Sequence, residues 1–299
     1  MFYNLSSNNL FYSFSKDNKV ALTVESGDSI CLETLDCFSN QIQSQSDKLD
    51  FIDWNRLNPA TGPIFIKDAM PNDTLEITIK KITISNKGVI ATGKDLGLFG
   101  NLMEELYFKL VEIRDDKIIF DEKTSLSLKP MIGVIGVAPE NGQINCGTPG
   151  SHGGNMDTKL ISEGAKLYLP VFVEGALFGL GDLHALMGDG EIGVSGVEVA
   201  GKVVVELRVL KKHTISNPII KTNNVVATIA SHKTLDGAAS IAVFNMANIF
   251  KKFTNMGIKD ISMLFSIAGN LEISQVVDPL KTARFSMPNI VLENYGICF

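Results

Sequence analysis

Residues 166–184 read KLYLPVFVEGALFGLGDLH and set the β character of the chain. They contain two apolar segments, 166–173 and 176–184, that are joined by a Glu-Gly pair. Short apolar segments bounded by a glycine turn are typical of β-strands, so we expect two strands joined by a tight turn. The second segment ends on Asp182 and His184, which lie two positions apart and therefore point to the same face of a strand. The stretch predicts a β scaffold with polar side chains at a strand end.

The same kind of pattern extends over the first 210 residues. In one expected strand, Val203, Val205, Leu207 and Val209 alternate with more polar residues and would share one face. Many of the 26 glycines fall between Gly133 and Gly201, where they favour tight turns between apolar strands. The segments that we expect to pair as further hairpins are 20–24 with 30–34, 107–113 with 117–120, and 192–199 with 202–210.

The last third of the chain changes character. Asp236 is the expected N-cap of a helix over roughly Gly237 to Asn255, and Asp260 is expected to open a second helix. Strand-like segments follow at 272–277 and 283–287. We therefore predict a mainly β fold with an α+β C-terminal part. The expected parts, which we predict to form one globular unit, are 1–130 (N-terminal β), 131–212 (glycine-rich β with the site motifs) and 213–299 (α+β).

Composition restricts the partners and the location. The 299 residues are 45% hydrophobic, which allows a large core, and the net charge is −6, from 27 basic and 33 acidic residues. Because no basic face stands out, we do not expect nucleic-acid binding. No apolar run reaches the roughly 18 residues of a membrane span. The N-terminus has no signal-peptide pattern and the four cysteines form no C-x-x-C pair, so we expect a cytoplasmic protein with free thiols.

Two glycine-rich segments hold most of the reactive side chains: PGSHGGNMD at 149–157 and GDLHALMGDGE at 181–191. Asp182 and His184 can converge on one divalent metal, with His152 and Asp157 arriving from a loop. Such oxygen and nitrogen ligands suit zinc, and the oxygen-rich set also tolerates calcium or manganese. The segments therefore predict a metal site.

A metal in this setting would lower the pKa of bound water towards about 7 and polarise a substrate carbonyl. A spare carboxylate, Glu191 or Glu140, would then move protons to a leaving group. Simpler readings remain for other residues. Asp189-Gly190 fits a turn equally well, and Cys146 lacks an activating neighbour in the sequence, so a structural thiol is favoured.

Six motifs make the sequence resemble the acetamidase/formamidase family. Two are the segments at 149–157 and 181–191. The other four are Glu33-Thr34-x-Asp36, NPATGP at 58–63, GVIGVAP at 133–139 and QVVDP at 275–279. The motifs are spread from residue 33 to residue 279, so the resemblance covers nearly the whole chain.

This resemblance implies hydrolysis of small linear amides, such as formamide or acetamide, to the acid and ammonia. It also implies a β-sandwich or barrel architecture, a homodimer, and a divalent metal near the His and Asp motifs, with zinc as the first expectation. By position in the matching motifs, the implied metal ligands are Asp36, Asp157, Asp182 and His184. The implied catalytic residues are His152 and Asn155, which would orient substrate or water, Glu140 as proton shuttle, and Glu191.

One departure from the family leaves the substrate open. The family often carries Gln between Ala185 and Gly188, where this chain has Leu186-Met187. Losing an amide side chain there either removes a hydrogen bond to the substrate or changes only the packing. Two alternatives therefore stay open: hydrolysis of a cyclic amide or another non-peptide C–N bond, and a non-catalytic, metal-containing protein that binds a small molecule.

Overall fold

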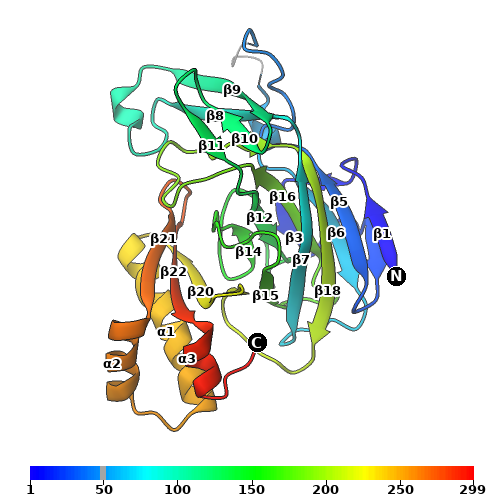
Figure 1. The fold of residues 1–299 in the computed structure, drawn as a ribbon. Coiled ribbons are helices and arrows are strands. Elements are labelled where there is room, and N and C mark those ends of the chain that lie inside the picture. Colours follow the sequence, from blue (N-terminus) through cyan, green and yellow to red (C-terminus); the bar gives the residue numbers. More distant parts are fainter. Residues whose placement is uncertain (48–51) are drawn as a thin grey trace.

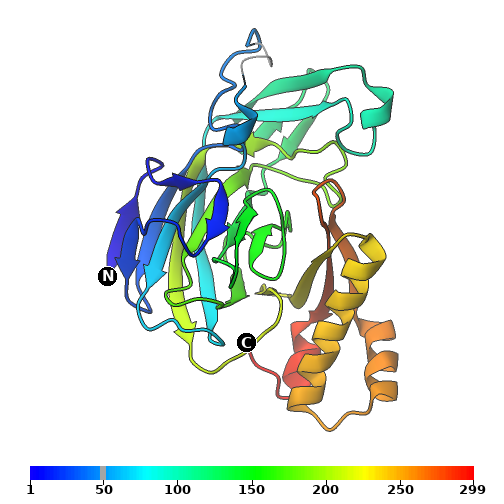
Figure 2. The same cartoon turned by 180° about the vertical axis from the view of Figure 1, so that it is seen from behind.

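The computed structural model describes residues 1–47 and 52–299. Two large β-sheets pack against each other, and within the described residues all three α-helices follow residue 234. Figures 1 and 2 show the sheets on one side of the molecule and the helices beside the last strands on the other. The predicted mainly β fold with an α+β C-terminal part is confirmed.

The first sheet joins the N-terminal strands to the C-terminal ones. Its strand β18 (Gly201–Leu210) alternates as predicted, since Val203, Val205 and Leu207 are fully buried while Lys202 and Arg208 are exposed. In spatial order, its described strands are β1 (Phe2–Leu5), β5 (Ser29–Thr34), β18 (Gly201–Leu210), β7 (Thr74–Ile84), β15 (Lys166–Pro170), β19 (Ile219–Lys221), β20 (Val225–His232), β22 (Lys281–Pro288) and β21 (Asn270–Gln275).

The second sheet carries the strand that ends on His184. Its main path runs through β11 (Ser125–Ser127), β10 (Lys117–Ile119), β9 (Leu106–Arg114), β8 (Lys87–Gly93), β17 (Glu198–Val199), β16 (Phe178–His184), β12 (Met131–Gly136) and β14 (Gly153–Asn155). Strand β6 (Ala60–Ile66) pairs with β16, and β2 (Leu10–Phe11) and β4 (Leu22–Val24) pair with β6. A small ribbon pairs β3 (Ser13–Ser15) with β13 (Gln143–Asn145). Among the described residues, the 3₁₀-helices are η2 (Trp54–Arg56) and η3 (Gly100–Leu102).

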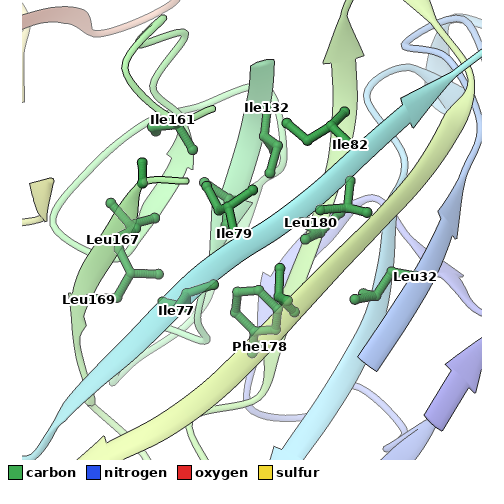
Figure 3. Packing of buried hydrophobic residues seen from close by; sticks show 14 of the residues in the cluster. Leu32, Ile77, Ile79, Ile82, Ile132, Ile161, Leu167, Leu169, Phe178 and Leu180 are labelled. Carbon is green, nitrogen blue, oxygen red and sulfur yellow. The ribbon is translucent and has the colours of Figure 1, made fainter. Parts of the chain in front are cut away.

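The main hydrophobic core lies between the two sheets. Ile77 and Ile79 of β7 meet Ile132 of β12 and Leu180 of β16, and each of these side chains is fully buried. Figure 3 shows these side chains directed into the same interior from strands of both sheets. Burial of apolar surface is the dominant favourable term in folding. Packing at this interface therefore fixes the position of β16, whose end carries residues of the site.

The C-terminal layer has its own core. Helix α1 (Leu235–Phe253) packs on β20 and β22, and α2 (Ile258–Ala268) and α3 (Asn289–Asn294) lie beside them. Phe250 of α1 contacts Phe265 of α2 edge-on, with ring centroids 5.2 Å apart. The predicted cap at Asp236 is wrong. Thr234 caps α1 by accepting a hydrogen bond from the Gly237 N–H, and Asp236 lies in the first turn.

Most predicted strands exist, but several predicted pairings are wrong. Segments 107–113 and 117–120 do pair, as β9 and β10, across Asp115 and Asp116, which both have positive φ as a tight hairpin requires. The other hairpins are absent from the described residues, because their two strands belong to different sheets. Between β15 and β16, three consecutive residues from Gly175 to Leu177 adopt positive φ and turn the chain from one sheet to the other.

The predicted division at residues 130 and 212 stays a prediction. The first sheet contains strands from all three predicted parts, so their backbones share hydrogen bonds. Among the described residues, no helix is long and apolar enough to cross a membrane.

Candidate functional site

A cavity lies where the end of β16 and the loop that follows it face the β8–β9 hairpin. Its polar lining residues are Cys37, Asn58, Thr92, Asn155, Asp182, His184, Glu191, Ser195, Glu198 and Asp278. Neither Lys nor Arg lines it within the described part of the chain. The cavity therefore concentrates negative charge in a buried place, where it is strongly disfavoured unless protons or cations compensate it.

The imidazole of His184 lies at the centre of this charge. Its Nε2 atom is surrounded by four carboxylate oxygens: Glu198 Oε2 at 3.3 Å, Asp182 Oδ2 at 3.6 Å, Asp157 Oδ1 at 3.8 Å and Glu191 Oε1 at 4.0 Å. All five side chains are buried. Asp182 and His184 thus converge, as the two-residue spacing in β16 predicts.

The backbone around these acids is unusual. Asp157, Asp182 and Glu191 have φ values of 41°, 55° and 47°, in the left-handed region that L-residues rarely adopt. Space for two of them comes from Gly133 in β12, because a Cβ at that position would overlap carboxylate oxygens of Asp182 and Asp157. Non-glycine residues with positive φ tend to gather at functional sites, where surrounding structure holds them in place.

The loop that carries Glu191 is attached to the C-terminal layer. Gly190 donates a backbone hydrogen bond to Ser274 O (2.8 Å) and accepts one from Val276 N (3.1 Å). Its neighbour Asp189 is held by both terminal nitrogens of Arg284, at 2.9 and 2.8 Å. Arg284 is fully buried in β22, so Asp189 is an ion-pair partner as well as a turn residue.

Burial shifts the acid groups towards their neutral forms. It raises the pKa of Asp157 to about 7, against the opposing effect of His184, and that of Glu198 to about 8. It also holds the pKa values of Glu191 and Asp278 well above the ordinary range, with the Asp157 charge acting in the same direction.

The pKa of His184 is also raised, but by neighbouring charges and not by burial. Burial lowers the pKa of this imidazole, but the carboxylates of Glu198 and Asp182 outweigh burial and raise the pKa well above the ordinary value. Without another cation, His184 therefore carries the positive charge that the acids require.

Two groups of side chains can hold a metal ion. One is Asp157, His184 and Glu191, and the other is Cys37, Asp182 and Glu198, each with ligand atoms within 4.8 Å of one another. The donors are carboxylate oxygens, an imidazole nitrogen and a thiol, which suit a divalent transition metal. Several of these atoms, including both oxygens of Asp157 and Oε2 of Glu198, are buried without a hydrogen-bond partner, so the residues present fit an ion.

The structure brings together most of the residues predicted for the site. Asp157, Asp182 and Glu191 meet around the imidazole of His184. Asn155 also lines the cavity, where its Nδ2 donates to Asp278 Oδ2 at 3.0 Å.

Three other predicted residues lie elsewhere. Glu140 is exposed on a loop. His152 is buried against Phe14, with ring centroids 5.3 Å apart, and burial lowers its pKa to about 4. Asp36 is buried and accepts a hydrogen bond from Asn40 N (2.7 Å), while burial raises its pKa to about 6. Among the described residues, neither metal-binding group includes any of the three.

Sequence reasoning missed Cys37, Glu198 and Asp278. Cys37 directly follows Asp36, and Asp278 lies in the QVVDP motif, so both were adjacent to noted features. Glu198 stands between Val197 and Val199 at the start of β17, and an isolated acid between apolar residues is the signal that it gave. Cys146, which was predicted to be structural, is fully buried and its thiol lies 3.7 Å from Phe11 O.

Fold and site together define the class: a two-sheet β protein with a buried, carboxylate-rich cavity around one imidazole. The profile of the Acetamidase/Formamidase family matches residues 5–146 and 143–291, and the chain belongs to this family.

Solved structures of similar proteins extend over the whole chain. A predicted acetamidase/formamidase from Thermoanaerobacter tengcongensis is 64% identical, with a TM-score of 0.99 and coverage of 100% of this chain and 99% of its own. An acetamidase from Bacillus halodurans is 46% identical, with a TM-score of 0.96 and coverage of 98% and 99%.

Similarity to curated relatives is more partial. A formamidase from Methylophilus methylotrophus is 29% identical over 167 residues, which are 48% of this chain and 41% of the relative. A relative from Schizosaccharomyces pombe is 27% identical over 270 residues, covering 68% of this chain and 64% of the relative. The chain therefore spans less than two thirds of either relative.

Proposed function

We propose that the protein hydrolyses small linear amides of the formamide and acetamide class to the carboxylic acid and ammonia, with the help of a divalent metal. The observation that carries this proposal is the ring of four carboxylate oxygens around His184 Nε2 in a cavity. Membership of the acetamidase/formamidase family supports the reaction class.

Asp157, His184 and Glu191 would hold the ion, with Cys37, Asp182 and Glu198 as a second set of donors beside them. Zinc fits this mixture of imidazole, carboxylate and thiol donors best, and calcium or manganese would favour the carboxylates alone. When bound, such an ion supplies Lewis acidity, which lowers the pKa of water and polarises an amide carbonyl. The ligand role predicted for Asp36 stays a prediction.

In this proposal, Asp278 is the general acid that transfers a proton to the leaving group. The Asn155 amide fixes one oxygen of the Asp278 carboxyl at 3.0 Å, and the other oxygen would exchange a proton with the leaving ammonia. Burial and nearby acids raise the pKa of Asp278, which favours the protonated form that a general acid needs. Asn155 thereby orients the acid. The catalytic roles predicted for Glu140, His152 and Glu191 stay predictions, and in this proposal Glu191 would act as a ligand.

Assembly and location remain expectations from the sequence. We propose a homodimer in the cytoplasm whose partner at the site is a small amide. Sedimentation of the purified protein at several concentrations would distinguish a dimer from a monomer.

Ammonia release from formamide and acetamide tests the function. We expect activity in the metal-loaded protein, and a loss of at least about 100-fold in kcat/KM after chelation or in His184→Asn. His232→Asn, at an exposed imidazole hydrogen-bonded to Thr234, is the matched control and should stay near wild type. Metal-loaded protein that releases no ammonia from linear amides would overturn the proposal, and turnover of lactams alone would favour the cyclic-amide alternative.

A further inference from the structure

A second cavity lies where the connection from β18 to β19 meets helix α1 and the last two residues, Cys298 and Phe299. It shares no lining residue with the cavity around His184. Its volume is about 120 Å³, whereas about 15 Å³ is enough to hold one water molecule. A ligand of several non-hydrogen atoms therefore fits here.

The charge around this second cavity is opposite to that around His184. Lys252 and His213 line it, and neither Asp nor Glu does so within the described part of the chain. Burial lowers the pKa of His213, and the positive charge of Lys252 lowers it further. The lysine charge thus reaches the imidazole without an acid in the cavity to offset it. Such a concave, positive place attracts anions.

Neutral hydrogen-bonding groups accompany the two basic side chains. The amides of Asn217, Asn245 and Asn248 line the same cavity. The Nδ2 atom of Asn245 is buried and has no hydrogen-bond partner among residues 1–47 and 52–299. A buried donor without an acceptor is costly, so an acceptor supplied by a ligand would be favourable here.

The remaining surface of the cavity is mostly apolar. Ile219 belongs to the core of the C-terminal layer, and Ile215, Ile249 and Phe299 pack against that core. Phe253 completes the apolar lining. An inorganic anion would leave this surface against water, whereas the hydrocarbon part of an organic anion would cover it, which is favourable.

The segment that carries His213 is fastened to the start of β7. The Thr74 hydroxyl donates to His213 O and also lies 3.4 Å from His213 Nδ1. One residue earlier, Lys212 N donates to Asp73 Oδ1 at 2.9 Å, and Asp73 pairs with Lys211. These bonds hold the imidazole in a defined position, so the cavity is a built feature of the junction between β7 and the C-terminal layer.

We infer that this cavity is a second binding site, which takes a small organic carboxylate. Lys252 and His213 hold the carboxylate group, Asn245 donates a hydrogen bond to it, and the apolar side chains cover the hydrocarbon part. Binding at this site requires no amide hydrolysis, so the inference goes beyond the proposed function and does not depend on it.

Titration of the metal-loaded protein with butanoate, followed by NMR, tests the inference. The chain has four histidines, so its imidazole resonances can be assigned, and His213→Asn identifies the resonance of His213. We expect butanoate to shift the His213 resonance in a saturable way. A separate shift of His184 would report binding at the acids. Butylammonium and 1-butanol, which have the same chain without negative charge, should leave His213 nearly unchanged.

Lys252→Met removes the charge but keeps an apolar side chain. We expect it to weaken the binding of butanoate at His213 by at least about tenfold, because a charge-assisted hydrogen bond is lost. Lys251→Met makes the same change at the neighbouring exposed residue, which does not line the cavity, and should keep the wild-type affinity.

Three results would overturn the inference. The first is a His213 resonance that does not move with butanoate. The second is equal affinity for butanoate in Lys252→Met and Lys251→Met. The third is tighter binding of inorganic phosphate than of butanoate at His213, because the apolar surface would then contribute nothing. None of these results bears on ammonia release, so they leave the proposed function untouched.

Discussion

Gly133 illustrates how single residues shape the site. It lies in β12 against the carboxylates of Asp182 and Asp157, and the missing side chain is the space that those oxygens occupy. Sequence alone indicated that glycines cluster here, but not which of them faces the acids. Identifying that glycine requires the pairing of β12 with β16, two strands that are far apart in the chain.

Replacing Gly133 by alanine should therefore disturb the acids more than the fold. We expect Gly133→Ala to lower metal affinity and kcat/KM by at least about tenfold, because two ligands must move. Metal content after dialysis is the readout. Gly257→Ala, at the start of α2 with φ of −71°, adds the same methyl group where the nearest atom lies 3.8 Å away and should bind metal normally. Equal metal content in the two variants would show that Gly133 has no such role.

The acids also predict a pH dependence. Burial raises the pKa of Asp157 to about 7 and of Glu198 to about 8 in the folded protein. Because the folded protein favours their neutral forms, both groups contribute to the free energy of unfolding. This contribution is fully present below their unfolded pKa of about 4 and is lost as the pH rises through 7 and 8. Metal-free protein should lose up to about 1.4 kcal/mol of unfolding free energy per pH unit for each proton released.

Denaturant unfolding at pH 5 to 9, with and without zinc, measures this dependence. Because metal replaces the protons, zinc should stabilise the protein more at pH 8 than at pH 6. Stability of the metal-free protein that increases from pH 6 to pH 8 would contradict the account.

At the scale of elements, strands were predictable and their partners were not. The alternation of Val203, Val205 and Leu207 identifies β18 directly, because burial of one face leaves a period of two in the sequence. Nothing local to 192–199 shows that its last two residues join the other sheet as β17. Partners in a two-sheet fold are set by packing over long sequence distances, whereas the β9–β10 hairpin is set by its own turn.

The loop from β16 to β17 is held to the C-terminal layer in part by the ion pair between Asp189 and Arg284. Arg284→Met would leave the partly exposed Asp189 with Lys159 but without its bidentate partner, so we expect a loss of about 1.5–3 kcal/mol in unfolding free energy. Because Glu191 follows two residues later, metal affinity should fall as well. Arg284→Lys should recover only part of both properties, since lysine cannot form the same pair of hydrogen bonds.

Lys159→Met is the matched control for this prediction. Lys159 also contacts Asp189, at 2.6 Å, but its side chain is about half exposed. Its loss should change the unfolding free energy by no more than about 1 kcal/mol. Similar effects of the two methionine variants would argue against a special role for the buried arginine.

At the scale of the molecule, the site is assembled from segments that lie far apart in the sequence. Cys37, Asp157, His184 and Asp278 come from an N-terminal loop, the glycine-rich middle and the C-terminal layer. The two motifs at 149–157 and 181–191 supplied the imidazole of His184 and three of the four acids around it. The other contributors depend on the packing of the whole chain, which no single stretch of sequence encodes.

The central claim is that the acids around His184 hold a metal on which amide hydrolysis depends. Titrating metal-free protein with zinc while measuring both bound metal and ammonia release from acetamide tests it most directly. We predict that activity is negligible without metal and rises with bound zinc until both reach a plateau at the same number of equivalents. Full activity in the metal-free protein, or bound zinc without ammonia release, would contradict the claim.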